Sequence, residues 1–441
     1  MFDPRRAPFK DKCRRRTAPS APIKVIATAA ARGLPWRPLT IDHETRHADD
    51  ARLISDPGPE LRRRAEGLVQ TMRERAPEAE ELRRLPTQTL ADFDDAGFLR
   101  ALRPIDAGGL GTDLQTFADI TRILGRGDAS AGWVAGLFLS HVLMLSKLGT
   151  EAQEEIFGDR AAVSASATTS PPGIAVPAEG GWTVSGRWRF ASGIDHAEWA
   201  VVMALADSER MLVAVPTAEL TIHDTWYVPG MKATGSKDIE AVELFVPEPR
   251  VTPFAGVASD SPPGVDSHHY PLLRYPLSRV FPLIHSAVAV GVADAALDLF
   301  LESVETRTRQ QTRGRVIEEE AIHEIYARAF LSRRSAELLL ADAVAIADEG
   351  YAEPGSDLSP ERRAAANLAN VGAALRAFET VDLLGRAAGA SVQRSGHPIE
   401  RICRDTQVMR THGLVDWVYH GPANGRILLG MGYGDLPADA F

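Results

Sequence analysis

Two histidines stand at positions where an imidazole could move a proton. One belongs to an apolar stripe that recurs at every fourth residue, which predicts a ring on the apolar face of a helix: Trp133, Leu137, His141 and Leu145. His412 lies in RDTQVMRTHGLVDW, whose apolar residues predict the buried side of another helix. Such a ring titrates near neutrality and can exchange a proton with a substrate hydroxyl or a peroxide oxygen. The alternative for both is a core histidine satisfied by one hydrogen bond.

Three small residues interrupt an alternating segment further along the chain. Residues 186–199 read GRWRFASGIDHAEW, and the alternation predicts a strand that stalls on Ala191-Ser192-Gly193. Trp188 and Trp199 flank the small residues, and we expect both to be packing anchors. A hydroxyl and a glycine between two aromatic anchors raise the question of what approaches the chain there.

Two further segments concentrate hydroxyl groups. SASATTSPPG includes Ser166 and Thr168 before a Pro-Pro-Gly turn, and GMKATGSKDIEAVELFVP places Thr234 in a turn before a strand. Hydroxyls and turn amides can bind the polar edge of a heteroaromatic ring. The alternative is ordinary loop chemistry, in which the same groups cap turns and connect elements.

Composition narrows the possible partners. The 441 residues carry a formal net charge of -10, with 44% hydrophobic and 24% charged residues, as in globular proteins. The negative charge disfavours nonspecific binding to nucleic acid or to an anionic membrane. Cys13 and Cys403 form neither a disulfide framework nor a metal motif, so we expect no metal and a reducing, cytoplasmic location. The apolar run from Trp133 to Leu145 is too short to span a bilayer.

The pattern along the chain predicts an α+β protein in three parts. Residues 52–160 show helical periodicity, with one helix ending at Gly125 and Gly127. Residues 161–265 alternate as short strands, with a hairpin turn expected at Gly180-Gly181. Residues 266–441 become helical again. Residues 1–51 are basic and without period, and we expect a disordered leader, with a targeting or docking segment as the alternative.

The last part predicts four long helices with short links, which favours an antiparallel bundle. The third helix begins at Ser359-Pro360, where serine caps and proline takes the first turn. The fourth covers residues 405–430, with a kink or irregular turn expected at Pro422. No GxGxxG follows a predicted strand, which argues against a dinucleotide-binding fold and a P-loop.

Taken together, four motifs in this order resemble a known family across residues 55 to 430. They are DASAGWVAGLFLSH, SGRWRFASGIDHAEW, GMKATGSKDI with LFVPEPRV, and RDTQVMRTHG. The resemblance is to two-component flavin-dependent monooxygenases with an acyl-CoA dehydrogenase fold, such as the oxygenase components of 4-hydroxyphenylacetate and secosteroid phenol hydroxylases. It implies an N-terminal helical domain, a middle β-barrel or β-sandwich domain and a C-terminal four-helix bundle, assembled as a homotetramer.

The resemblance also implies an activity. A separate NAD(P)H:flavin reductase would supply diffusible reduced FMN or FAD, and the oxygenase would use O2 through a flavin hydroperoxide to hydroxylate a phenolic small molecule. His141 would contact the substrate, Ser192 would lie near the flavin N5, and His412 would support peroxide formation or hydroxyl transfer. Further flavin contacts would come from these residues of the β domain: Ser166, Thr168, Trp188 and Thr234. Arg279, with His285 close by, would be a second substrate contact.

The sequence departs from the dehydrogenases of this fold in two places. His412-Gly413 stands where their Glu-Gly base segment would fall, and ETRTRQQTRGRVIEEE has no Phe beside Gly314, which implies a looser flavin. Relatives carry a further serine where this chain has Ala167. The alternatives are N- or S-oxygenation on the same fold, a dehydrogenase with a displaced base, and a flavin-free binding protein.

Overall fold

Five α-helices precede the sheet in the computed structural model, which describes residues 56–310, 313–349, 358–432 and 434. They are α1 (Gly58–Leu82), α2 (Thr87–Asp95), α3 (Leu114–Gly127), α4 (Ala129–Leu145) and α5 (Thr150–Phe157). Helices therefore occur where the periodicity predicted them, and α3 ends at Gly127 as expected. The leader predicted for residues 1–51 lies outside the described residues.

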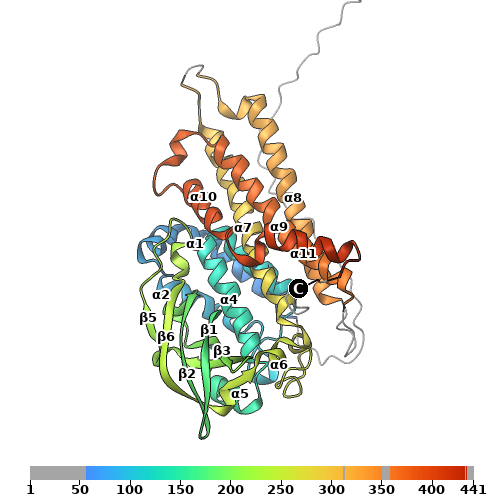
Figure 1. Cartoon of the computed structure of the whole chain (residues 1–441). Helices are drawn as coiled ribbons and strands as arrows, with labels where there is room; N and C mark the ends of the chain where they lie inside the picture. The colour runs from blue at the N-terminus through green and yellow to red at the C-terminus, as the bar shows by residue number, and fades with distance from the viewer. Residues whose placement is uncertain (1–55, 311–312, 350–357, 433, 435–441) are drawn as a thin grey trace, which may run out of the picture. The chain divides into compact units, whose positions relative to one another are not determined.

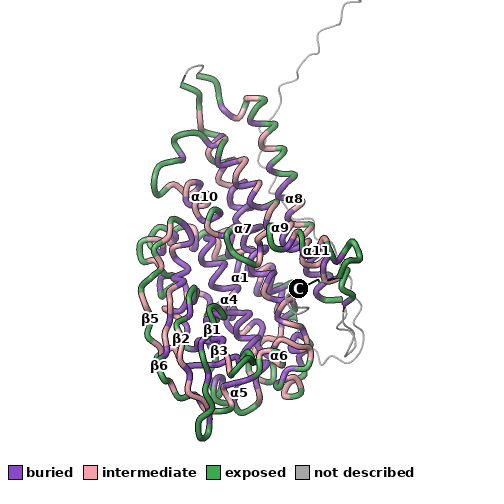
Figure 2. The backbone as a smooth tube through the Cα atoms, in the orientation of Figure 1, coloured by how far each residue is buried: buried purple, intermediate pink, exposed green. Residues whose placement is uncertain are grey.

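Helix α4 is buried along nearly its whole length (Figures 1 and 2). Asp128 caps it, since its carboxylate accepts a hydrogen bond from the backbone N–H of Ala131. Sixteen of its seventeen residues are buried, and Leu137 is the exception. A helix that is apolar all round must be covered on all sides, and α3, α7 and the sheet cover this one.

Seven strands follow and form one sheet in the order β5-β6-β2-β1-β3-β4-β7. Their bounds are β1 (Ala165–Ala178), β2 (Gly181–Ala191), β3 (Trp199–Ala206), β4 (Glu209–Pro216), β5 (Thr221–His223), β6 (Lys237–Pro247) and β7 (Val251–Pro253). β1 pairs in parallel with β3, and the other pairs are antiparallel. Ala178 pairs with Gly181, and Gly180 has a φ of +77°, so the predicted hairpin is confirmed.

The expected middle β domain is confirmed, and where a barrel or sandwich was expected the described strands form a single sheet with β5 and β7 as its edges. Helices take the place of a second sheet at its centre. Alternate residues of β3 and β4 enter two different hydrophobic clusters, one on each face. One of these clusters includes residues of α4 and α5, and α6 (Phe254–Ala258) adds Val257 to it. The middle strands are therefore buried on both faces.

Trp188 is one residue whose expected role the structure changes. Its side chain is 0% exposed, and its indole N–H donates a 2.7 Å hydrogen bond to the carbonyl oxygen of Met203. A Cβ atom at Gly173 or Gly186 would come within 2.7 Å of the indole ring, so both glycines make room for it. Trp188 is a packing anchor as expected, and the flavin contact assigned to it was wrong because no face of the ring is accessible.

Five helices form the C-terminal part: α7 (Leu277–Thr306), α8 (Glu320–Asp348), α9 (Pro360–Ala387), α10 (Pro398–Met409) and α11 (Trp417–Leu428). Ser359 caps α9 by accepting a hydrogen bond from Arg362 N, which confirms its predicted start. The continuous fourth helix was wrong: α10 ends at Met409, and α11 begins at Trp417. The side chains of His412 and Asp416 cap backbone N–H groups between the two helices, whereas Pro422 lies inside α11.

Buried charges join helix α3, which precedes the sheet, to helices α7 and α8, which follow it. The Asp294 carboxylate on α7 accepts hydrogen bonds from Arg122 on α3 and from Arg333 on α8. Arg122 also forms an ion pair with Glu337 on α8, at 3.2 Å. Residues 55–441 form one compact unit, and the three-domain boundaries expected above stay a prediction.

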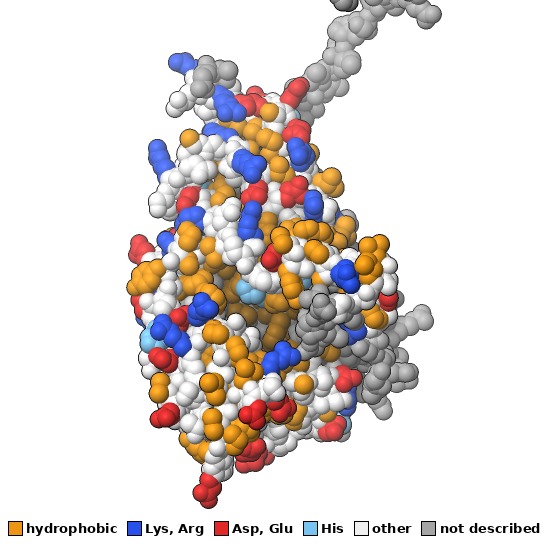
Figure 3. Space-filling view, viewed as in Figure 1, with side chains coloured by type: hydrophobic (Ala, Val, Ile, Leu, Met, Phe, Trp, Pro, Cys, Tyr) orange, Lys and Arg blue, Asp and Glu red, His pale blue; other side chains and the backbone are white. Residues whose placement is uncertain are grey.

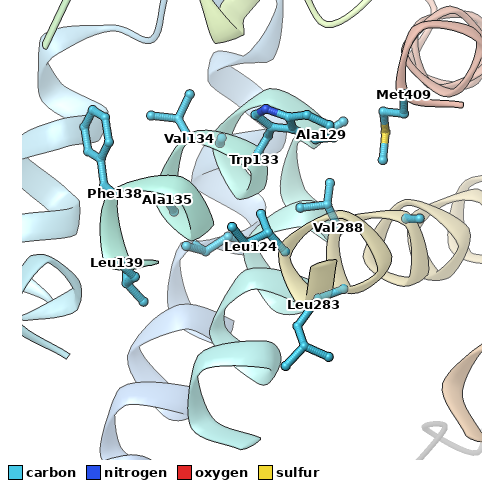
Figure 4. Close-up of a cluster of buried hydrophobic side chains, with 14 of the residues drawn as sticks. Leu124, Ala129, Trp133, Val134, Ala135, Phe138, Leu139, Leu283, Val288 and Met409 are labelled. Carbon is cyan, nitrogen blue, oxygen red and sulfur yellow. The ribbon is translucent and has the colours of Figure 1, made fainter. Parts of the chain in front are cut away.

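The apolar core between α4 and α7 carries the site described below. Figure 4 shows Trp133, Val134 and Phe138 of α4 among these side chains, with Val288 from α7 and Met409 from α10 beside them. Helix α7 is long and apolar enough to span a membrane by composition alone. However, 89% of its most apolar window is buried inside the protein, which is typical of a core helix.

Candidate active site

Two histidines, His285 and His412, pack against Trp133, and a third, His141, lies two turns further along the helix that carries Trp133. We call Trp133, His141, His285 and His412 the histidine cluster. The rings of His285 on α7 and His412 after α10 stack with centroids 4.0 Å apart and planes 24° apart. The Trp133 ring meets both edge-on, at 4.6 Å and 5.3 Å. His141 packs edge-on against Phe281, one helical turn before His285, at 5.8 Å. The structure thus brings together the two predicted histidines and adds a third.

The hydrogen-bond partners assign a hydrogen to one nitrogen of each neutral ring. Nδ1 of His141 lies 2.9 Å from the carbonyl oxygen of Ala165, and Nδ1 of His285 lies 3.1 Å from that of Phe281. Because a carbonyl only accepts, both Nδ1 atoms carry hydrogen, and both Nε2 atoms keep a lone pair. His412 is the reverse: its Nδ1 accepts from the backbone N–H of Leu414, so its Nε2 carries the hydrogen. The cluster offers two acceptors and one donor.

The surroundings keep these rings neutral. Burial lowers the pKa of His141 to about 4, although its bond to Ala165 opposes the shift. Burial, with His412 as a second cause, lowers the pKa of His285 well below its ordinary value. Part of His412 is exposed to solvent, yet the protein atoms packed around its ring lower its pKa as well. Neutral imidazoles can accept a proton from a bound hydroxyl group, which imidazolium ions cannot.

The molecular surface is hollowed between the sheet and the C-terminal helices. Figure 3 shows hydrophobic side chains lining this hollow, with a histidine at its edge. A cavity of about 510 Å³ lies elsewhere, between α9 and α11, and none of its lining residues belongs to the histidine cluster. We therefore place the candidate active site at the hollow, because it combines apolar walls with convergent polar groups.

A second group of residues packs against the same helix, and we call residues 190–196 and 231–237 the Ser192 corner. Ser192 Oγ lies 2.7 Å from Ser236 Oγ, and the N–H of Gly193 donates to the carbonyl of Thr234 at 2.7 Å. The ion pair between Lys237 and Asp195, at 2.7 Å, closes the other end. Two segments about forty residues apart in sequence are thus held together.

Gly193 explains why small residues interrupt the strand. Its φ is +75°, a conformation that residues with a Cβ rarely adopt. A Cβ atom there would lie 2.7 Å from the Phe138 ring and 3.0 Å from Val134. The glycine therefore lets the Ser192 corner pack directly against α4, where it contacts Val134, the residue that follows Trp133. The histidine cluster and the Ser192 corner share this helix.

The two predicted hydroxyl groups of β1 donate hydrogen bonds to the backbone of the segment that carries Ser192. Ser166 Oγ donates to the carbonyl of Ser192 at 2.8 Å, and Thr168 Oγ1 donates to that of Arg189 at 2.6 Å. Their hydroxyl hydrogens are engaged with the backbone that carries Ser192. Ser166 and Thr168 hold the corner in place, and a direct cofactor contact from either stays a prediction. Thr234 lies within the corner itself, 2.7 Å from Ser236 Oγ.

Arg279 lies apart from the histidine cluster. It lines a small cavity of about 30 Å³ between α7, α8 and α9, together with Ala343 and Asn370. Arg279 precedes His285 by six residues, which places the two on different faces of α7. The substrate contact assigned to Arg279 stays a prediction, and its position on a different face of α7 from His285 does not favour it.

Three residues of the site were not singled out from the sequence. His285 was noted only as a neighbour of Arg279, although it stacks on His412. Ser236 lies with its Oγ 2.7 Å from Ser192 Oγ, a contact between two loops that no local sequence pattern indicates. Phe190, two residues before Ser192 in sequence, is 61% exposed, adopts a φ of +66° and packs its ring edge-on against Trp226, with centroids 6.2 Å apart. Among the described residues, no group of His, Cys, Asp or Glu could hold a metal ion.

Comparison with known proteins decides the family. The oxygenase subunit HsaA of a flavin-dependent monooxygenase from Rhodococcus jostii is 31% identical over 387 residues, which cover 85% of this chain and 98% of that subunit. The chain belongs to the flavin-dependent monooxygenases. Residues 59–162 of this monooxygenase match the family of acyl-CoA dehydrogenase N-terminal domains, and residues 283–417 match the family of their C-terminal domains. These matches confirm the acyl-CoA dehydrogenase-like fold.

Solved structures agree with this assignment. The 3-HSA hydroxylase from Rhodococcus superposes with a TM-score of 0.81 at 28% identity, covering 88% of the monooxygenase and 100% of that chain. XiaF from Streptomyces, solved with FADH2 and glycerol, has a TM-score of 0.80 at 26% identity, covering 86% and 97%. The p-hydroxyphenylacetate 3-hydroxylase oxygenase component of Acinetobacter baumannii is 27% identical, over 81% of this chain and 86% of that component.

Proposed function

We propose that this monooxygenase is an oxygenase component that hydroxylates a phenolic small molecule with O2 and reduced flavin. The observation that carries the proposal is the opposed hydrogen-bonding character of the rings in the cluster: His141 and His285 present lone pairs, and His412 presents an N–H. The hydroxyl group of a phenol can donate its hydrogen to the lone pair of His141. This hydrogen bond makes the aromatic ring of the phenol more electron-rich. The Nε2–H of His412 can stabilise an oxygen atom that gains negative charge.

The Ser192 corner suits a flavin. Ser192 is 8% exposed, so its hydroxyl can reach the polar edge of a planar ring, and Phe190 offers an aromatic surface two residues away. When bound, reduced flavin supplies the electrons that activate O2. Apolar walls around α4 keep water from the reacting atoms, which favours oxygen transfer over loss of hydrogen peroxide. Either reduced FMN or reduced FAD meets these contacts.

The flavin would arrive from a separate NAD(P)H:flavin reductase. Relatives named as oxygenase subunits or components support this partner, since that name implies a second component. We also propose a homotetramer in the cytoplasm. Support for self-association comes from large apolar side chains that are exposed on two C-terminal helices: Phe330, Leu331 and Leu338 on α8, and Trp417, Val418 and Leu428 on α11. Sedimentation of the purified protein would measure the number of copies.

The experiment is a product analysis with a generic flavin reductase, NADH and a panel of phenols under isotopically labelled O2. We expect one labelled oxygen atom in a hydroxylated product and little hydrogen peroxide. Labelled product from an amine or a sulfur compound, and none from any phenol, would show that the enzyme is an N- or S-oxygenating monooxygenase. Reduction of a dye by an acyl-CoA without the reductase would identify a dehydrogenase with a displaced base.

A further inference from the structure

Three hydroxyl groups of the Ser192 corner form a chain that ends on a backbone carbonyl. Ser192 Oγ lies 2.7 Å from Ser236 Oγ, which lies 2.7 Å from Thr234 Oγ1. Thr234 Oγ1 lies 2.8 Å from the carbonyl oxygen of Met231. All three side chains are buried, at 8%, 5% and 2% exposure from Ser192 to Thr234. We call this series the hydroxyl relay.

The direction of every bond in the hydroxyl relay is fixed by its last member. A carbonyl oxygen cannot donate, so Thr234 must give its single hydrogen to Met231. Ser236 must then donate to Thr234, because the hydrogen of Thr234 is already engaged. The hydrogen of Ser236 is engaged in turn, so Ser192 must donate to Ser236. Ser192 Oγ is left with lone pairs only.

A buried carboxylate from another helix anchors the end of the relay. The backbone N–H of Met231 donates to Asp405 on α10, and Met231 has a φ of +53°. Gly230 allows this approach, since a Cβ there would lie 2.2 Å from the carbonyl oxygen of Arg404. The N–H of Met231 is therefore held by Asp405, and its carbonyl oxygen accepts from Thr234.

We infer that Ser236 and Thr234 are positioning residues that make Ser192 an obligate hydrogen-bond acceptor, and that this selects reduced over oxidised flavin. The inference rests on the proposed position of the flavin edge at Ser192. Reduced flavin carries N–H at N5 and can donate to Ser192 Oγ. Oxidised flavin has only a lone pair at N5, which would face the lone pairs of Ser192. An oxygenase that takes up reduced flavin and releases oxidised flavin benefits from this difference.

The test measures the dissociation constants of reduced and oxidised flavin, the former without O2, in the full-length protein and its variants. In Ser236→Ala the hydroxyl of Ser192 is free to rotate and to donate to oxidised flavin. We therefore expect the ratio of the two constants, oxidised over reduced, to fall about tenfold, the value of one hydrogen bond. Thr234→Val frees Ser236 and hence Ser192, so the ratio should fall in the same direction. Thr234→Ser keeps the hydroxyl and should restore it.

Two further variants separate the possible failures. Ser146→Ala removes a buried hydroxyl that caps α4 by donating to Val142, away from the corner, and should leave the ratio unchanged. Ser192→Ala should lower affinity for reduced flavin. If Ser192→Ala changes neither constant, the flavin does not lie at Ser192, and both the proposed flavin position and the inference that rests on it are overturned, whereas the product analysis tests hydroxylation separately. If Ser192→Ala weakens binding but Ser236→Ala and Thr234→Val keep the wild-type ratio, only the hydroxyl relay is overturned.

Discussion

The rings of His285 and His412 stack at 4.0 Å although the two residues lie more than a hundred positions apart in the chain, one on α7 and the other in the connection after α10. At this separation a proton on one ring disfavours a proton on the other, and His412 is one cause of the lowered pKa of His285. The two imidazoles therefore act as a unit that holds at most one positive charge. When both rings are neutral, Nε2 of His285 can accept a hydrogen bond and Nε2 of His412 can donate one.

Removing the nitrogens of the stacked pair should uncouple flavin oxidation from hydroxylation. His412→Phe and His285→Phe keep an aromatic ring in each position but remove the polar atoms. We expect each to lower product per reduced flavin by at least tenfold, with hydrogen peroxide formed instead. The double variant should cost no more than the worse single one. His323→Gln, at an exposed position on α8, is the control. Additive losses would show that the two rings act separately.

Arg279 should not contribute to substrate affinity. Because it faces the cavity between α7, α8 and α9, Arg279→Gln should leave the KM for the phenol within about twofold of wild type. His141→Gln, in the cluster, should raise KM or lower kcat by tenfold or more. Steady-state kinetics measure KM and kcat of the two variants side by side. A large rise in KM for Arg279→Gln would show that Arg279 does contact the substrate.

Asp405 should make stability depend on pH. Burial, reinforced by the charge of Asp128 and opposed by the N–H of Met231 and by Arg401 and Arg404, raises the pKa of Asp405 to about 7, well above the ordinary value of an aspartate. This carboxyl therefore contributes most to stability below pH 4, and the contribution is lost as pH rises through 7.

The variant Asp405→Asn cannot ionise, yet its side-chain oxygen can still accept from Met231. Its free energy of unfolding should exceed that of wild type by an amount that grows from pH 4 to 7 and is constant above. Asp405→Ala leaves the Met231 N–H unsatisfied and should lose about 1–3 kcal/mol. Denaturant unfolding at pH 5 and pH 8 measures both. A pH-independent difference between Asn and wild type would contradict the raised pKa.

Gly193 should tolerate no side chain. Gly193→Ala forces a Cβ into a left-handed conformation and against Phe138, so we expect a loss of at least about 1 kcal/mol and a weaker flavin site. Gly67→Ala is the matched control, because nothing lies within 4 Å of its Cβ position on α1, and it should be neutral or stabilising by up to about 1 kcal/mol. Thermal unfolding compares the two, and equal behaviour would argue against the close packing of the corner on α4.

Much of the fold could be predicted from the sequence because local signals agree with it. The caps and glycines at the ends of α3 and α9 act within one turn, and the Gly180 hairpin needs only its own residues. The single sheet could not be predicted, since the choice between a second sheet and covering helices depends on long-range contacts of β3 and β4. The break between α10 and α11 was missed because side-chain caps, and not proline, define it.

The site was predicted in part for the same reason. His141, Ser192 and His412 carry chemically distinctive groups inside recognisable motifs. The structure places His141 and His412 in one cluster, and Gly193, next to Ser192, packs against the helix that carries His141. Arg279 and His285 depended on the rotation of α7 about its axis, and the apolar residues on nearly every side of that helix give no preferred face. Ser236 depended on which loop packs against Ser192, which no local pattern reveals.

The interruption between α10 and α11 also bears on how such a protein can change during evolution. His412 stands in a short connection, outside both α10 and α11, so replacing its side chain removes the cap on the Leu414 N–H but no hydrogen bond within either helix. The helices around it keep the fold while the residue in the gap varies. A scaffold arranged in this way can exchange its reactive group, and with it the reaction it performs, in a single mutational step without first losing its architecture.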